Sequence, residues 1–171
     1  IAGDLGYGDL HAQAQALAGK LAAQDLGRSP VVLFGHKHRS YQVAWWACLL
    51  SGRAAIPVEP DTPATRLAAI ARSCGAGLLL STEPGTALPA PSGHDVWDMH
   101  AIPEAPSSAL TEPDDGDVAY VMYSSGSTSQ PKGIKVTYAN LADFVLWLRN
   151  YLLADVAFQA VSGTVRHCFD V

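Results

Sequence analysis

Residues 31–58 read VVLFGHKHRSYQVAWWACLLSGRAAIPV, and this stretch decides the fold class. Apolar residues fill positions 31–34 and 54–58, and a segment long enough for a helix lies between these two runs. Short, wholly apolar strands on either side of a helix are typical of a parallel sheet that is buried on both faces. We therefore predict a strand–helix–strand unit, whose helix is capped by Ser40 and ended by Gly52.

The same alternation of helices and strands continues on both sides of this unit. Residues 7–24 carry leucine and alanine at helical spacing and predict a helix before the first strand. Thr62 and Pro63 are typical of a helix start, and Gly75 is typical of a helix end. Residues 78–80 form a third apolar strand. The order predicts an α/β fold with βαβ units, in which helices flank a parallel β-sheet.

Residues 83–113 differ from the rest because they contain six of the eleven prolines. We interpret them as a Pro-rich crossover loop with at most a short strand near Val96 and Trp97. We expect this loop to separate two sub-sheets within one domain. A further apolar strand is predicted at 118–123.

Residues 120–133, YVMYSSGSTSQPKG, carry the chemistry of the chain. A β-prone run stops at small hydroxyl and glycine residues, which offer donors without bulk and let the backbone approach a ligand closely. A lysine adds a positive charge, so the loop predicts a cradle for a polyphosphate. The candidate phosphate-binding residues are Ser124, Ser125, Gly126, Ser127, Thr128 and Lys132. A serine-rich hairpin loop that binds nothing is the alternative.

Two further elements are expected after this loop. Residues 134–137 predict a second strand, so that the loop joins two strands. Residues 140–153 predict an amphipathic helix. Its apolar residues include Phe144, Trp147, Leu148 and Tyr151.

Composition excludes some classes of partner. The net charge is -5 and no run of basic residues exists, so a nucleic-acid partner is not expected. The longest apolar stretch, 43–50, is too short to cross a bilayer, so no membrane insertion is expected. Cys48, Cys74 and Cys168 are isolated in sequence, which favours free thiols in a reducing compartment and a cytoplasmic location.

Two histidines follow the first predicted strand. His36 and His38 alternate in the sequence and could share one side of the chain. No third residue lies at a spacing that would complete a zinc site, so we predict no metal-binding residues in the chain itself.

Residues 123–133, YSSGSTSQPKG, resemble the pattern Y-T-S-G-[ST]-T-G-x-P-K-G of the adenylate-forming superfamily. This superfamily includes acyl-CoA synthetases, luciferases and the adenylation domains of nonribosomal peptide synthetases. Residues 49–60, LLSGRAAIPVEP, are similar to its L-x-A-G-x-A-Y-V-P-[LV]-D-P segment, and residues 6–10, GYGDL, to its L-T-Y-x-E-L opening. Ser124 replaces a threonine of the pattern, and Ser129 replaces a glycine.

The resemblance implies a fold and a reaction. Residues 1–171 would form part of the N-terminal, large subdomain of an adenylation domain. The reaction would be the activation of a carboxylic acid by ATP with Mg²⁺ as cofactor. Thr128 and Lys132 would be the catalytic residues of the loop, acting on the phosphates.

The resemblance also suggests the substrate. Residues 139–148, ANLADFVLWL, look like the N-L-x-x-F-x-x-W pattern of D-alanine–carrier protein ligases. Phe169 and Asp170 match a family dipeptide whose aspartate holds the substrate ammonium in amino-acid-activating members. Asp170 would then bind the amino group, and an acyl or peptidyl carrier protein would accept the product on its phosphopantetheine thiol. The alternative is that Asp170 is an ordinary residue at a strand end.

Three other hypotheses remain open at this point. The same chemistry could serve an acyl- or aryl-CoA synthetase-type ligase. The chain could instead be a truncated, non-catalytic remnant that binds nucleotide or a partner. It could also be a phosphate-binding α/β protein outside the superfamily.

Overall fold

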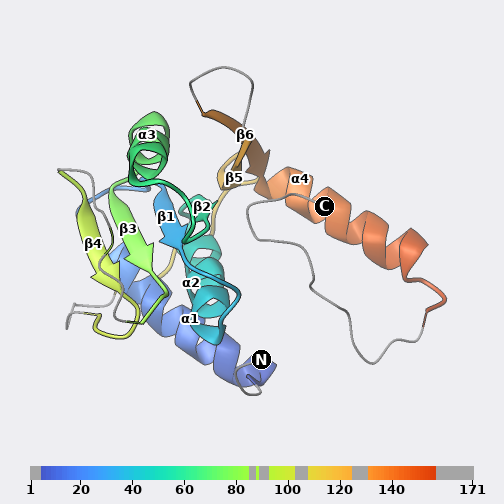
Figure 1. The fold of residues 1–171 in the computed structure, drawn as a ribbon. Coiled ribbons are helices and arrows are strands. Elements are labelled where there is room, and N and C mark those ends of the chain that lie inside the picture. The colour runs from blue at the N-terminus through green and yellow to red at the C-terminus, as the bar shows by residue number, and fades with distance from the viewer. Residues whose placement is uncertain (1–4, 85–87, 89–92, 103–107, 125–130, 157–171) are drawn as a thin grey trace.

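The computed structural model describes residues 5–84, 88, 93–102, 108–124 and 131–156 (Figure 1). The strands are β1 (Val31–Phe34), β2 (Ala55–Val58), β3 (Leu78–Ser81), β4 (Asp95–Asp98), β5 (Val118–Ser124) and β6 (Lys132–Thr137). The helices are α1 (Tyr7–Ala22), α2 (Arg39–Leu50), α3 (Ala64–Cys74) and α4 (Tyr138–Trp147), and α4 continues into a π-helical turn, η1 (Leu148–Leu152).

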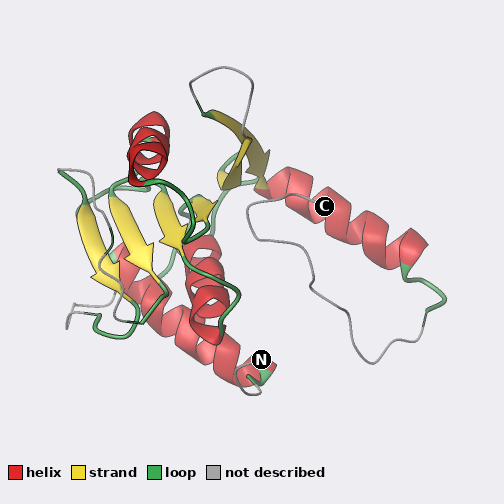
Figure 2. Ribbon diagram, in the orientation of Figure 1, coloured by secondary structure: helices red, strands yellow, loops and turns green. Residues whose placement is uncertain are grey.

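All six strands belong to one sheet, in the order β4-β3-β1-β2-β5-β6. Strands β4, β3, β1, β2 and β5 are parallel, and β6 runs antiparallel to β5. The predicted α/β fold with a mostly parallel sheet is therefore confirmed, and Figure 2 shows helices on both of its faces.

The expectation of two sub-sheets is wrong. Strand β5 pairs with β2 through Ala55 and Tyr120, so the chain returns to the first sheet after the crossover at 83–113. The crossover itself contributes β4 at the opposite edge, which confirms the short strand predicted near Val96 and Trp97.

Strand β1 is the centre of the core. Val31 and Leu33 pack in a cluster with α1 and α2, while Val32 and Phe34 pack in a second cluster with α3. Successive side chains of a strand point to opposite faces, so a strand between two layers of helices needs apolar residues at every position. Burial of each such side chain contributes about 1.5–3 kcal/mol. This requirement explains the uninterrupted VVLF run.

Helix α2 begins one residue before Ser40, so Ser40 is not the predicted cap. His38 occupies the N-cap position with extended backbone and makes no side-chain cap hydrogen bond. The Ser40 hydroxyl instead donates to the carbonyl oxygen of Thr82 at 3.1 Å. The hydroxyl therefore joins α2 to the end of β3, a contact that local sequence does not encode.

Helix α3 begins and ends close to the predicted positions. Pro63 stands at the N-cap, one residue later than predicted, and its carbonyl accepts from Arg66 N and Leu67 N at 2.9 Å. Gly75 ends the helix in the left-handed conformation with φ 64°, which confirms the predicted stop.

Helix α4 begins two residues earlier than predicted because Thr137 and Asn140 form a capping box. The Asn140 backbone N–H donates to the Thr137 hydroxyl at 3.2 Å, and the Asn140 carboxamide oxygen accepts from the Thr137 N–H at 3.1 Å. The Tyr138 hydroxyl donates to the Leu49 carbonyl at 2.7 Å and so joins the first turn of α4 to α2.

The apolar residues of α4 and η1 are exposed, whereas an amphipathic helix ordinarily buries its apolar face. No residue of α4 or η1 is buried, and the exposed fractions of Phe144, Trp147 and Tyr151 are 49%, 49% and 76%. Asn140 and Asp143 lie three positions apart on one side of α4, and the described residues leave the apolar side chains on its other sides exposed.

Arg53 lies almost entirely buried, with 2% exposure, between the end of α1 and the start of β2. Its guanidinium donates to the Leu21 carbonyl at 2.9 Å, to the Gln24 carbonyl at 3.5 Å and to the Ser29 carbonyl at 3.2 Å. The Leu21 carbonyl lies in the last turn of α1, where the helix dipole favours a cation. Burial lowers the pKa of Arg53.

We predict that Arg53→Met lowers the free energy of unfolding of the chain by about 2–4 kcal/mol, because it removes hydrogen bonds to the buried Leu21 carbonyl and to the half-buried carbonyls of Gln24 and Ser29. Urea unfolding followed by circular dichroism measures this change. Arg39→Met is the matched control, since Arg39 is exposed on α2. Equal unfolding midpoints for the two variants would contradict the structural role of Arg53.

Candidate active site

The ends of five parallel strands define the candidate site. Because β1, β2, β3, β4 and β5 run in the same direction, their carboxyl ends lie at one edge of the sheet. Ligands of open α/β sheets bind outside this edge. Strand β5 ends there at Ser124, immediately before the predicted phosphate loop.

The structure brings two of the predicted phosphate-binding residues together. Ser124 and Lys132 are paired opposite each other in the antiparallel register of β5 and β6. They form the base of the loop, one at the end of each strand. Ser125, Gly126, Ser127 and Thr128 lie outside the described residues, and so does Asp170.

Arg66 is a component of the site that sequence reasoning missed. This residue of α3 donates from its guanidinium to the Ser124 carbonyl at 3.3 Å, across 58 positions of sequence. Arg66 and Lys132 therefore place two cations beside the start of the loop, an arrangement that favours an anionic ligand. The predicted helix start at Thr62 and Pro63 could have identified Arg66, because an arginine in the first turn of the helix after β2 lies near this edge of the sheet.

Gly133 allows β6 to lie close against β5. A Cβ atom at this position would lie 2.8 Å from Val121 Cγ1 and 3.1 Å from Tyr123 Cζ. The Tyr123 hydroxyl in turn donates to the Ser73 hydroxyl at 3.3 Å, and burial raises the pKa of Tyr123. Close packing therefore explains why a glycine follows Lys132, because a side chain at position 133 would push Lys132 away from Ser124.

A cleft of about 250 Å³ lies between the C-terminal end of α3 and the β5–β6 hairpin and extends to the residues that precede β1 and β2. Burial raises the pKa of its Cys74 thiol, which keeps this thiol protonated and weakly reactive. The cleft is lined by Pro30, Ala54, Ser73, Cys74, Val118, Val121, Tyr123, Gly133 and Lys135.

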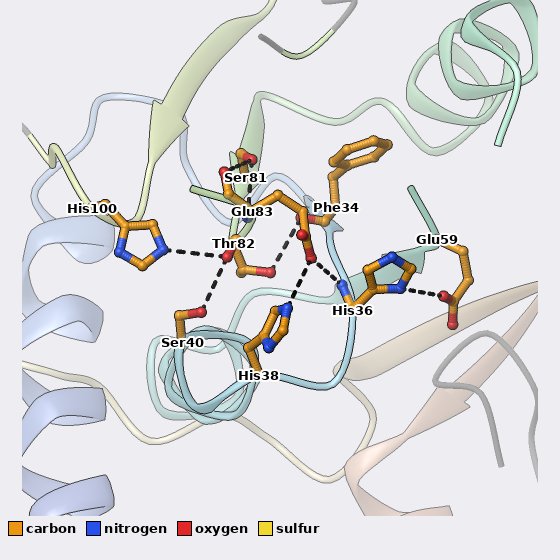
Figure 3. A network of polar contacts seen from close by, with 9 residues as sticks. All are labelled: Phe34, His36, His38, Ser40, Glu59, Ser81, Thr82, Glu83 and His100. Carbon is orange, nitrogen blue, oxygen red and sulfur yellow. Dashed lines mark hydrogen bonds and ion pairs between the residues drawn. The ribbon is translucent and has the colours of Figure 1, made fainter. Parts of the chain in front are cut away.

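A second polar network joins the ends of the neighbouring strands (Figure 3). The Glu83 carboxylate accepts from the His36 backbone N–H at 2.6 Å and lies 3.7 Å from His38 Nε2. The His36 ring lies 3.5 Å from the Glu59 carboxylate. The two histidine rings thus contact different carboxylates: the His36 ring contacts Glu59 after β2, and the His38 ring contacts Glu83 after β3.

Thr82 extends this network towards β4. Its carbonyl accepts from the Ser40 hydroxyl and lies 3.4 Å from His100 Nε2, while its own hydroxyl donates to the Phe34 carbonyl at 3.3 Å. The network holds the ends of β1 to β4 in place. Within the described part of the chain, no group of three or more His, Cys, Asp or Glu residues could hold a metal ion.

Comparison with known proteins identifies the family. The sequence model described as AMP-binding enzyme matches residues 2–168. The D-alanine–D-alanyl carrier protein ligase of Bacillus licheniformis is 33% identical over 152 residues, which cover 85% of this chain and 30% of that ligase.

Solved structures give the same result. The nonribosomal peptide synthetase FmoA3 with bound α-methyl-L-serine-AMP has a TM-score of 0.74 and 27% identity, covering 86% of this chain and 17% of that protein. A structure from a study of fatty acyl-adenylate ligases of E. coli and L. pneumophila has a TM-score of 0.72 and 25% identity, covering 86% of this chain and 28% of that protein.

The chain thus spans about a third or less of the length of each of these proteins. In the part of the chain that the structure describes, no helix is long and apolar enough to cross a bilayer. The family match over nearly all of the chain's length, together with the paired loop anchors Ser124 and Lys132, shows that the chain belongs to the family of AMP-binding, adenylate-forming enzymes.

Proposed function

We propose that this chain is part of an enzyme that activates an amino acid with ATP and transfers the aminoacyl group to a carrier protein. The observation that carries the proposal is the base of the loop, where Ser124 and Lys132 face each other at the carboxyl edge of the sheet and Arg66 adds a second cation. Residues 1–171 would belong to the N-terminal subdomain of an adenylation domain.

The reaction has two steps. A carboxylate oxygen of the amino acid attacks the α-phosphorus of ATP, the bond from this phosphorus to the bridging oxygen breaks, and pyrophosphate leaves with the electron pair. The resulting acyl adenylate is then attacked by the phosphopantetheine thiol of the carrier, which releases AMP and forms a thioester.

The residues of the loop would act by stabilising charge on the phosphates. Lys132 and the hydroxyls of Ser124, Ser125, Ser127 and Thr128 would hold the β- and γ-phosphates of ATP, with Thr128 nearest to the reacting groups. Ser124 and Lys132 fit this role, because they stand opposite each other at the ends of the two strands that carry the loop. Mg²⁺ bound to the phosphates would neutralise part of their charge.

The amino-acid substrate is supported by the relatives. One is a D-alanine–D-alanyl carrier protein ligase, and another is a nonribosomal peptide synthetase with bound α-methyl-L-serine-AMP. In this proposal Asp170 pairs with the substrate ammonium, so that each charge offsets the desolvation of the other. A cytoplasmic location is part of the proposal, since Cys48 and Cys74 are free thiols.

A fatty acid is the second candidate substrate, because the fatty acyl-adenylate ligase structure is nearly as similar as the peptide synthetase. It would need the same loop and the same phosphate chemistry. It would not need a carboxylate at Asp170.

We predict amino-acid-dependent ATP–pyrophosphate exchange by the full polypeptide that the gene encodes, with D-alanine, L-amino acids and a fatty acid assayed in parallel. Exchange with one amino acid is the expected result, since the adenylate forms reversibly. Exchange with the fatty acid alone would favour the second candidate. A folded protein that binds ATP in a calorimetric titration but shows no exchange with any acid would favour the non-catalytic remnant.

We further predict that Lys132→Ala lowers the exchange rate by on the order of a hundredfold, because it removes a charge aimed at the phosphates. Lys135→Ala is the matched control, because Lys135 belongs to the same strand and its replacement removes the same charge. Circular dichroism should show that both variants keep the fold. An unchanged exchange rate in Lys132→Ala would refute the role assigned to the loop.

A further inference from the structure

The β5–β6 hairpin has a group of polar contacts at the end that lies away from the phosphate loop. One end of the hairpin is the pair Ser124 and Lys132, and the other end, its root, is where β5 begins and β6 passes into α4. In Figure 1 the hairpin lies at the edge of the sheet, and β6 leads directly into α4. The polar contacts made at the root by Arg28, Asp117 and Tyr138 are named the root contacts.

The backbone of the hairpin has few other connections to the sheet. Strand β5 is in register with β2 at one pair of residues, Ala55 and Tyr120. Within the described residues, the part of β5 beyond this pair is hydrogen-bonded in the sheet to β6 alone. Two contacts with α3 lie nearer to the loop, at Tyr123 and Ser124, and both are exposed hydrogen bonds of 3.3 Å. The backbone of the hairpin is therefore attached mainly at its root.

Tyr138 is the centre of the root contacts. Its backbone N–H donates to the Asp117 carbonyl at 3.0 Å, which closes the root of the hairpin. Its hydroxyl donates to the Leu49 carbonyl at 2.7 Å, which attaches the root to the last turn of α2. Burial, together with the nearby Cys48 and Asp117, raises the pKa of Tyr138 to about 12, so the hydroxyl stays a neutral donor. This half-buried hydrogen bond is shorter than both exposed contacts with α3.

Asp117 attaches the root to a second segment. Its carboxylate accepts from the Arg28 guanidinium, and from the Asp114 backbone N–H at 3.0 Å. Arg28 belongs to the turn before β1 and lies close to Gly52, where an added Cβ atom would lie 3.5 Å from Arg28 Cζ. Arg28 and Leu49 therefore both hold the root beside the C-terminal end of α2, from two different segments of the chain.

The length of β6 makes the root important for the loop. Strand β6 has six residues, and at about 3.4 Å per residue Lys132 lies about 17 Å along the strand from the root. A rotation of about 3° at the root would thus move Lys132 by about 1 Å. Misplacement of a group by about 1 Å can lower the rate of an enzyme about a hundredfold. A small change at the root therefore becomes a significant change at the candidate phosphate site.

We propose that Tyr138 and the Arg28–Asp117 pair are positioning residues that set the place of Lys132 for the binding of ATP. They act through the backbone of the hairpin and not by contact with the substrate. The inference rests on the proposed function for its nucleotide, whereas the attachment of the hairpin can be measured without one. Loss of a root contact should loosen β6 and weaken the binding of ATP, but it should not change the binding of the amino acid, which Asp170 would hold.

The first test is Tyr138→Phe in the full polypeptide that the gene encodes, because this change removes only the hydroxyl. Amide hydrogen exchange without nucleotide should become about threefold to tenfold faster in β6 and stay unchanged in β1, since one hydrogen bond is lost at the root. In the ATP–pyrophosphate exchange assay, the KM for ATP should rise by a similar factor while the KM for the amino acid stays the same. Asp117→Ala should change both measurements in the same direction.

Tyr7→Phe is the matched control, because it also removes one hydroxyl and Tyr7 is 92% exposed on α1. It should behave as the wild type in both measurements. Unchanged hydrogen exchange of β6 in Tyr138→Phe would overturn the positioning role. So would a lower kcat with an unchanged KM for ATP, because a protein that is merely less stable supplies fewer active molecules without altering their affinity.

Failure of the proposed function has a different signature. In that case the wild-type protein itself would show no ATP–pyrophosphate exchange with any acid. The affinity for ATP in a calorimetric titration would then replace the KM in the same comparison of Tyr138→Phe with Tyr7→Phe. Equal affinities of these two variants, with equal hydrogen exchange in β6, would overturn the positioning role independently of catalysis.

Discussion

The burial of β1 on both faces is the constraint on which the other parts of the structure depend. Its four residues have exposed fractions of 0%, 0%, 0% and 3%, so each face must be covered by helices and each edge by a strand. Parallel neighbours satisfy this requirement only when helices cross over between them, as α2 and α3 do. The same crossovers bring the carboxyl ends of the strands to one edge, so the packing of the core determines where the site lies.

The carboxyl edge is held by contacts that have two different purposes. Around β1 to β4, the side chains of Glu83, Thr82 and Ser40 form hydrogen bonds with backbone groups at or next to the ends of neighbouring strands. These polar groups are hydrogen-bonded to one another within the protein and hold the ends of the strands together. At β5, by contrast, Arg66 and Lys132 bring charge to one residue, Ser124, without a described carboxylate to neutralise it. An anion would supply that missing charge, which is why we propose this corner as the phosphate-binding site.

Sequence predicted most of the elements but not their long-range pairing. The runs at 31–34 and 54–58 were identifiable because full burial leaves no polar position in a strand. The predicted N-cap at Ser40 was wrong because the Ser40 hydroxyl donates to the carbonyl of Thr82, the residue after β3. The single sheet was missed because the β2–β5 pairing spans a long crossover. For the site, the loop residues were readable as small donors, whereas Arg66 acts through a backbone carbonyl 58 positions away. The roles of Thr128 and Asp170 stay predictions.

Lys132 connects the candidate site to helix α4. It is the first residue of β6, and β6 passes directly into α4 through the capping box at Thr137. The ladder to β5 fixes one end of this unit, and the Tyr138–Leu49 hydrogen bond fixes its middle to the body. Close packing at Gly133 leaves no room for β6 to shift against Tyr123. The β5–β6 hairpin therefore sets the backbone position of Lys132 and also leads into α4. The packing of α4 and the placement of the lysine at the loop depend on the same strand, β6.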